Sequence, residues 1–211
     1  MKCFRENLVC SHRKHSFLIS ERIRMDKKDV IKIALELIKE KKLEKASIGE
    51  LVKRLNSSAG NLYYHFKSKN DIYEEVVNYS VNEINKKLNK VKTLDNQEDY
   101  LFALTKTLIK FFEEREEVLF FLISIKGSCY LEKEMKCQDF LINFKKIFLD
   151  DKKDQKNEEM LLLKLNMFLG SVYEVLYNTK LIKNRNLKEE EIDEIYKSFW
   201  GTAILENKYS N

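Results

Sequence analysis

The residues with the most varied chemistry lie close together in one short stretch, Ser58–Lys69, which carries hydroxyl, amide, phenol, imidazole and ammonium groups. Asn61 can donate and accept hydrogen bonds, and Tyr63 offers both an apolar ring and a hydroxyl. Ala59 and Gly60 are small enough to let another molecule approach closely. Groups of this kind read the base edges of DNA and hold its phosphates, so the stretch is a candidate nucleic-acid contact.

The remaining reactive side chains do not form a catalytic set. Catalysis needs a nucleophile and a base, or a metal cluster, within reach of one another, and the chain has three histidines, His12, His15 and His65. The sequence also has no glycine-rich loop that could cradle a phosphate. Cys3 and Cys10 precede the first two histidines, but the spacing of these four residues is not that of a zinc finger. We therefore predict that the protein is not an enzyme and that it has no catalytic residues, cofactor or metal.

The composition predicts an all-α fold. The 211 residues include no proline and five glycines, and 35% of them are charged and 44% hydrophobic, which is typical of long amphipathic helices. The longest uninterrupted apolar run, Val118–Ile123, is far shorter than the roughly 18 residues of a membrane span. Residues 1–24 lack the apolar region of a secretory signal. We therefore expect a cytoplasmic protein with no membrane partner and with four reduced cysteines, Cys3, Cys10, Cys129 and Cys137.

Three short helices are predicted near the N-terminus, because apolar residues recur at helical spacing from Met25 onward. Ser47–Glu50 has the pattern of a capping box and starts the second helix. Asn56 ends that helix, since asparagine tolerates left-handed backbone geometry, and Ser57 and Ser58 can cap the third helix. The turn between the second and third helices is about three residues long.

Longer helices are predicted beyond the third. Ser68–Asp71 caps a fourth helix, whose apolar stripe continues past the length that the first three helices need for cover. Asp95–Glu98 caps a fifth that runs to Phe112, and further helices are expected over residues 115–124, 131–149, 158–179 and 188–206, with a loop at 150–157. The chain then divides into a poorly ordered basic leader (1–24), a helix-turn-helix domain (25–72) and a second helical domain (73–211).

The second and third predicted helices have the arrangement of a helix-turn-helix, in which the later helix enters the major groove of DNA. Leu62 and Phe66 are four residues apart and are expected to anchor this helix, which spans residues 58–66. Tyr63, Tyr64 and His65 are consecutive and cannot all face one core. The sequence therefore predicts a recognition helix with a polar aromatic outer face.

Charge supports the same location for a DNA contact. Seven lysines and arginines but only two carboxylates lie within residues 41–69, whereas residues 81–211 have 22 basic and 23 acidic side chains. Attraction to phosphate depends on such local clustering. Ser47, Tyr64, His65 and Lys69 are expected at the DNA backbone, the first of them at a helix N-terminus. The predicted DNA-binding residues are Ser47, Ser58, Ala59, Gly60, Asn61, Tyr63, Tyr64, His65 and Lys69.

The stretch SIGELVKRLNSSAGNLYYHFKSKNDIYEEV resembles the DNA-binding signature of the TetR family of bacterial regulators. Its most specific part is S-x-G-x-L-Y-Y-H-F-K-S-K, and the resemblance covers about residues 27–79. The resemblance implies a three-helix DNA-binding head, a helical body that binds a small ligand and dimerises, and a fourth helix that acts as the lever between them. It also implies a homodimeric repressor that binds a palindromic operator.

Two positions depart from the pattern of that family. The turn that members commonly fill with Ala-Gly-Val is Leu55-Asn56-Ser57 here, so a serine replaces a buried apolar residue and is expected to loosen the turn. Ala59 stands where a longer polar side chain often reads a base. Direct readout is therefore expected to depend more on Asn61 and Tyr63.

Apolar stripes on the last two predicted helices suit a four-helix dimer interface, as the resemblance implies. Small residues near the stripes, such as Gly170 and Gly201, permit close approach of the helices. The alternative is that both helices close the core of one subunit. The predicted interface residues are Phe168, Val172, Leu176, Ile195, Phe199 and Ala203.

Aromatic residues gather in the second domain, since ten of the thirteen phenylalanines lie beyond residue 100. They suit a pocket for an apolar or aromatic effector that would tilt the fourth helix and move the DNA-binding helices. The alternative is that they fill an ordinary core. The predicted pocket residues are Phe111, Phe112, Phe120, Phe121, Phe144 and Met167.

The sequence leaves three alternatives open. Residues 1–24 are either the product of a mis-assigned start codon, with the folded protein beginning at Met25, or a basic arm that adds phosphate contacts. An architectural DNA-binding protein or a coactivator without a ligand is the alternative to a ligand-responsive regulator. An activator is the alternative to a repressor.

Overall fold

Every element in the described part of the chain is helical, so the predicted all-α fold is confirmed there. The computed structural model describes residues 26–92, 94, 96–126, 128, 144 and 155–208, with backbone alone for 155–158 and 202–208. The expected leader (1–24), the loop at 150–157 up to residue 154 and, apart from the helical residue Phe144, the helix expected at 131–149 lie outside the described residues. The elements are α1 (Lys27–Lys41), α2 (Ile48–Arg54), α3 (Ala59–His65), α4 (Lys69–Leu88), α5 (Gln97–Glu114), α6 (Glu116–Ile125), α8 (Gln155–Leu176), η3 (Tyr177–Ile182) and α9 (Glu189–Lys208).

Side-chain caps start the N-terminal helices where the sequence predicts them. The hydroxyl of Ser47 accepts the backbone N–H of Glu50 at the start of α2, and that of Ser68 accepts the N–H of Asp71 at the start of α4. At the start of α5 the cap is Asn96, whose side-chain oxygen accepts the N–H of Glu98 at 2.9 Å. Each cap satisfies a backbone donor that the first helical turn leaves without an intrahelical acceptor.

Positive φ angles mark the ends of the first two helices. Asn56 has φ 47° just after α2, so the predicted left-handed residue is confirmed. Lys42, which follows α1, has φ 70° and ψ 159°, a conformation that sterically favours glycine. The sequence did not predict this conformation at Lys42, because lysine is not a residue type that favours a positive φ.

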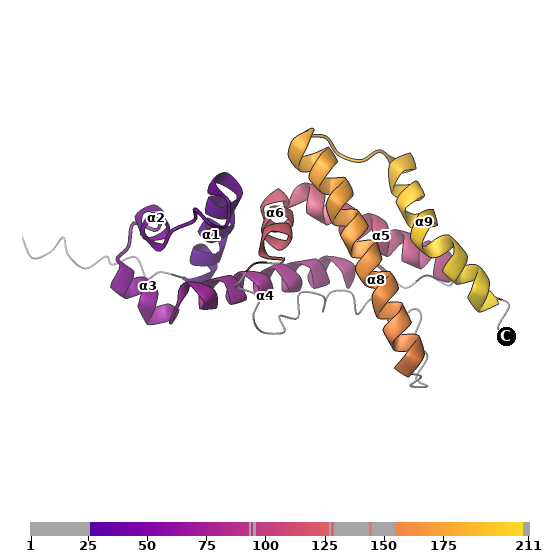
Figure 1. The fold of residues 1–211 in the computed structure, drawn as a ribbon, viewed down its shortest axis with the longest axis horizontal. Coiled ribbons are helices and arrows are strands. Elements are labelled where there is room, and N and C mark those ends of the chain that lie inside the picture. Colours follow the sequence, from indigo (N-terminus) through magenta and orange to yellow (C-terminus); the bar gives the residue numbers. More distant parts are fainter. Residues whose placement is uncertain are drawn as a thin grey trace, which may run out of the picture.

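Helices α1 to α3, which we call the head, gather at one end of the molecule, and α5, α6, α8, η3 and α9, which we call the body, lie towards the other (Figure 1). Helix α4 extends from the head into the body and packs against both α1 and α5. Val30, Ala34 and Ile38 on α1 are buried together with Ile72 and Val76 on α4. Helix α1 also packs against α6, so the head is joined to the body at a second place besides α4.

One segment of the body, Glu159–Ile182, is long and apolar enough to cross a membrane when judged by length and composition alone. The sequence analysis missed it by considering only uninterrupted apolar runs. In this structure Phe168, Val172 and Leu176 of the segment have no exposed area, because they pack against the rest of the chain. A core helix of a soluble protein passes the same test of length and composition.

Candidate DNA interface

Helix α3 is held down by two apolar side chains and presents two tyrosines to solvent. Leu62 and Phe66 are buried in the head, and Ser58 starts the helix by accepting the backbone N–H of Asn61 at 3.2 Å. Tyr63 is 49% exposed and Tyr64 is 85% exposed. This is the orientation that the sequence predicts for a recognition helix, because polar aromatic rings face outward over a fixed base.

The other predicted contacts of α3 lie around these tyrosines. Ala59 and Gly60 are exposed at its first turn, and a Cβ added at Gly60 would meet only the Ser58 hydroxyl, at 4.0 Å. Gly60 therefore has an ordinary helical backbone with open space beside it. His65 is half-buried, with its ring edge-on to that of Tyr64 at a centroid distance of 5.2 Å. The exposed surface of α3 thus extends from its first turn to its last.

The turn before α3 is closed by a hydrogen bond that sequence reasoning missed. The side-chain amide of Asn61 donates to the hydroxyl of Ser57 at 3.0 Å, and the backbone N–H of Ser57 donates to the carbonyl of Val52. Both side chains are half-buried. The Ser57 hydroxyl thus gains a partner in place of the apolar contact it lacks, and this bond opposes the expected loosening of the turn. The signal was available as a serine four residues before an asparagine.

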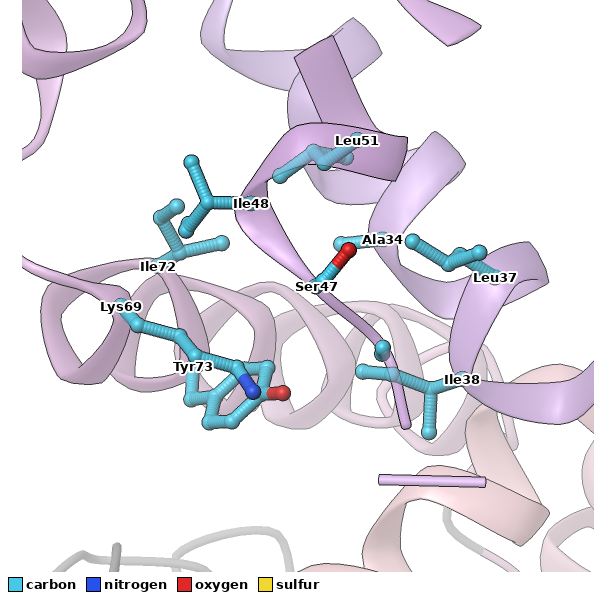
Figure 2. A pocket seen from close by; sticks show the side chains of 10 residues that line it. Ala34, Leu37, Ile38, Ser47, Ile48, Leu51, Lys69, Ile72 and Tyr73 are labelled. Atoms are coloured by element: carbon cyan, nitrogen blue, oxygen red, sulfur yellow. The ribbon is translucent and has the colours of Figure 1, made fainter. Parts of the chain in front are cut away.

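The two residues expected at the DNA backbone from α2 and α4 line one shallow pocket (Figure 2). Ser47 lies at the edge of the pocket, and Lys69 lies with its ammonium 5.3 Å from the centre of the Tyr73 ring. The Tyr73 hydroxyl donates to the carbonyl of Leu43 at 3.3 Å, which fixes the ring beneath the lysine. The other lining residues are apolar and come from α1, the loop before α2, α2 and α4: Ala34, Leu37, Ile38, Ala46, Ile48, Leu51 and Ile72.

The basic charge of the head is smaller than the residue count suggests. Arg54 pairs with Glu40 on α1, and Lys41 pairs with Glu50 on α2. The hydrogen bond from Arg54 lowers the pKa of Glu40, so this carboxylate stays charged against the guanidinium. Four other cations between residues 41 and 69 are exposed at the surface of the head: Lys42, Lys45, Lys53 and Lys67.

The predicted effector-pocket residues do not gather at one place. Phe112 packs against Tyr173 of α8, whereas Phe121 packs against Tyr73 of α4. Phe144 contacts Phe168 and Trp200. Of the other three predicted residues, Phe111 is buried, Phe120 is half-buried and Met167 is 58% exposed. The set therefore spans several neighbourhoods of the body.

The predicted dimer residues lie mainly in the core of the single subunit. Phe168, Val172 and Leu176 have no exposed area, Ile195 is buried and Phe199 is half-buried. The side chain of Ala203 lies outside the described residues. These positions close one subunit, which was the stated alternative, because these stripes of α8 and α9 face the chain's own helices. The exposed apolar residues of α8 are instead Met160, Leu163 and Met167, at helical spacing.

Charged residues at the junction of α5 and α6 form contacts that the sequence analysis did not foresee. The buried carboxylate of Glu113 accepts the backbone N–H of Leu187 at 2.5 Å and pairs with Lys110 at 3.0 Å. Glu116 pairs with Lys39 of α1 and Lys180 of η3. The only signal in the sequence was the run of five charged residues, 113–117, between two apolar helices.

Residues 30–76 match the family model described as bacterial regulatory proteins, tetR family. The chain is 30% identical over 105 residues to the HTH-type transcriptional regulator QacR of Staphylococcus aureus, a match that covers 43% of this chain and 56% of QacR. A second match, 35% identical over 83 residues, is to a structural maintenance of chromosomes protein 3 homolog of Plasmodium falciparum and covers 7% of that protein. The chain thus spans about half of one curated relative and a small part of the other.

Solved structures share the fold over most of the chain. A TetR family transcription regulator structure from Shewanella sp. PV-4 superposes with a TM-score of 0.68 at 13% identity, covering 85% of this chain and 98% of that one. A structure from Marinobacter aquaeolei VT8 gives 0.66 at 14% identity, covering 83% and 93%. The matched N-terminal segment runs from α1 into the first part of α4, and the shared fold extends through the body. Over residues 30–76 the chain is therefore similar to the regulatory proteins of the tetR family, and over most of its length it has the fold of solved TetR family regulators.

Proposed function

We propose that this chain is a homodimeric transcriptional repressor that binds a palindromic operator through α3 and is released by a small apolar or aromatic effector. Residues 25–72 form the DNA-binding domain, residues 73–211 bind the effector and dimerise, and the protein acts in the cytoplasm. The observation that carries the proposal is the orientation of α3, with Leu62 and Phe66 buried and Tyr63 and Tyr64 exposed.

The contacts with DNA follow from this orientation. Tyr63 and the small residues Ala59 and Gly60 face the groove and read base edges, and the side-chain oxygen of Asn61 can still accept from a base while its amide is bonded to Ser57. Tyr64, His65 and Lys69 bind the phosphates of the flanking backbone. Ser47 and Ser58 accept backbone N–H groups through their oxygens, and each hydroxyl can still donate its own hydrogen to a phosphate. The similarity to QacR, a transcriptional regulator of the HTH type, supports this use of the head.

The proposed dimer uses the outer face of α8. Met160, Leu163 and Met167 are each more than half exposed and line up on this face of the helix. Their position supports pairing with a second copy, because an exposed apolar stripe is covered at low cost by the same stripe on a partner. A symmetric dimer presents two α3 helices to two half-sites, which explains why the operator is expected to be palindromic.

The effector site is proposed in the aromatic interior of the body. Thr105 on α5 is fully buried, and its hydroxyl has no hydrogen-bond partner among the described residues. A buried polar atom of this kind is uncommon and gives a bound molecule one polar contact in an apolar setting. Helix α6 packs against both α5 and α1, so a molecule that displaces α5 or α6 would also move the head.

Selection from a pool of random double-stranded DNA tests the DNA-binding part of the proposal. The full-length protein is expected to enrich a palindrome, and hydroxyl-radical footprinting is expected to show two protected half-sites centred about one helical turn or more apart. Tyr63→Ala should strongly reduce the enrichment, while Tyr177→Ala, which changes an exposed tyrosine of η3, should leave it intact. Equal binding of all duplexes would favour an architectural protein instead.

The effector part needs a separate measurement. Apolar and aromatic compounds that raise the thermal midpoint of the protein are then added to the complex with the selected duplex. The proposal predicts that at least one such compound weakens DNA binding, because it must prefer the conformation that does not fit the operator. Stabilising compounds that leave DNA affinity unchanged would contradict a ligand-responsive regulator.

A further inference from the structure

One carboxylate joins the head to the far end of α8. Glu116 is the first residue of α6, and its Oε2 atom lies 2.6 Å from the ammonium nitrogen of Lys39 on α1. Its Oε1 atom lies 3.1 Å from the ammonium nitrogen of Lys180 on η3. Lys39 belongs to the first described helix and Lys180 to the segment that follows α8, and the two oxygens of one side chain connect them.

The local backbone of η3 brings Lys180 to this position. The segment is a π-helical continuation of α8, in which the N–H of Lys183 bonds to the carbonyl of Asn178, five residues earlier. Such wide turns are rare and are often found at functional positions. The side chain of Lys180 is only 13% exposed and also donates to the side-chain oxygen of Asn186, at 2.9 Å. The ammonium group of Lys180 is therefore held between Glu116 and Asn186.

Glu116 is also the most shielded charged link between head and body in the described residues. Its side chain is 26% exposed, and the hydrogen bond from Lys39, with a second from Lys180, lowers its pKa. The carboxylate thus stays charged near neutral pH. Helices α1 and α6 pack through apolar side chains, which can slide, whereas a charge-assisted bond at 2.6 Å fixes direction as well as distance.

We propose that Glu116 is a positioning residue for DNA recognition, fixing the orientation of α1, and with it α3, relative to α6 and the end of α8. The inference rests on the proposed function, since α8 carries the proposed dimer contact and α3 the proposed DNA contact. In the dimer, Glu116 then sets the distance between the two α3 helices and selects the spacing of the half-sites. The hydrogen bond from Lys39 attaches Glu116 to the head, and the one from Lys180 attaches it to the end of α8 in the body.

The test compares binding to duplexes that carry the selected half-site twice, with the spacing varied one base pair at a time, and to a duplex with a single half-site. Glu116→Gln, Lys39→Met and Lys180→Met should each lower affinity for the preferred spacing by about fivefold, a common size of coupling between sites. Affinity for the single half-site should stay unchanged, and Lys39→Arg should behave like the wild type because it keeps the charge. Glu189→Gln is the matched control, since Glu189 pairs with Lys106 at the same 2.6 Å but only between helices of the body.

Unchanged spacing preference in Glu116→Gln would overturn the proposal, and so would an equal loss on the single half-site, which would indicate damage to the head itself. Amide hydrogen exchange of the full-length protein without DNA separates this failure from that of the proposed function. Faster exchange in α1 and η3 of Glu116→Gln, but not of Glu189→Gln, is the expected result. If the wild type enriches no DNA sequence, the proposed function fails, and unchanged exchange in α1 would then reject the positioning role as well.

Discussion

Leu62 and Tyr63 are neighbours in the chain, yet the first is fully buried and the second is 49% exposed. The difference follows from helix geometry, because consecutive residues point in directions about 100° apart. Leu62 is the side chain that holds the recognition surface of α3 in place, and Phe66 extends the same buried edge one turn later. Tyr63 and Tyr64 can stay exposed only because this edge is filled.

Replacing Leu62 with alanine should therefore loosen α3. The expected loss in the free energy of unfolding is about 3 kcal/mol, which is typical for removing a buried leucine side chain. Urea denaturation followed by circular dichroism measures it. Tyr64→Ala is the matched control, and because the Tyr64 ring is 85% exposed its effect should stay within about 0.5 kcal/mol. Equal losses in the two variants would show that α3 is not anchored as described.

Lys42 is the other residue whose setting predicts a measurable effect. Its φ of 70° and ψ of 159° are costly for any residue with a Cβ, and its side chain is exposed. Lys42→Gly should raise the free energy of unfolding by about 1 kcal/mol, since the strain is removed and no packing is lost. Lys45→Gly, in the same loop but without a positive φ, should bring no gain. A lower free energy of unfolding for Lys42→Gly than for the wild type would show that the backbone at Lys42 is not strained.

At the scale of the elements, the start of α9 depends on one carboxylate. The carboxylate of Glu191 accepts hydrogen bonds from the two terminal guanidinium nitrogens of Arg185 at 2.8 Å. It also accepts one from the backbone N–H of Lys188 at 2.8 Å. The bonds from Arg185, followed by that from Lys188, lower the pKa of Glu191 from 4.5 to about 2. Glu191 thus caps the helix and ties the preceding loop to it.

The stabilising effect of Glu191 should depend on pH in a defined window. Its pKa is lower in the folded protein, so its contribution is complete above pH 4.5 and disappears as the pH falls towards 2. The thermal midpoint of Glu191→Gln should lie below that of the wild type at pH 7, and the gap should close between pH 4.5 and 2. Thermal scans at several pH values measure this. A gap that is constant with pH would contradict the assignment of charge to Glu191.

The elements show how far the sequence could predict this fold. Caps and breaks are local, so Ser47, Ser58 and Ser68 marked helix starts correctly, and Asn56 marked an end. Periodicity also indicated the anchors of α3. It could not indicate which neighbour covers a stripe, and for this reason the buried face of α8 was assigned to a dimer.

Contacts between distant segments were likewise beyond prediction. Glu116 meets Lys39 across 77 positions of the chain, and no pattern of residue types specifies that pairing. That contact follows only once the helices have been placed in space. The bond between Asn61 and Ser57 is local by contrast, and the serine four residues before the asparagine was a signal for it.

At the scale of the whole molecule, the proposed dimer requires that the outer face of α8 be covered. Leu163→Glu places a charge in the middle of this face and should convert the dimer to a monomer of about 25 kDa, because an unpaired charge at an apolar interface is unfavourable. Since Leu163 is 53% exposed, the subunit should remain folded. Sedimentation velocity measures the change.

The control for that experiment is Leu94→Glu, which alters an exposed leucine between α4 and α5. This variant should sediment as the wild type does. A Leu163→Glu protein that remains dimeric would show that the subunits associate through another surface, and the proposed geometry of the two α3 helices would then be wrong.

The central claim is that DNA contacts the exposed tyrosines of α3. Fluorescence anisotropy with the selected duplex tests it most directly, using Tyr63→Ala and, for comparison, Tyr177→Ala on η3 in the body. Tyr63→Ala should raise the Kd about tenfold or more, as expected for the loss of a base contact, while Tyr177→Ala should bind like the wild type. Equal Kd values for Tyr63→Ala and the wild type would contradict the account.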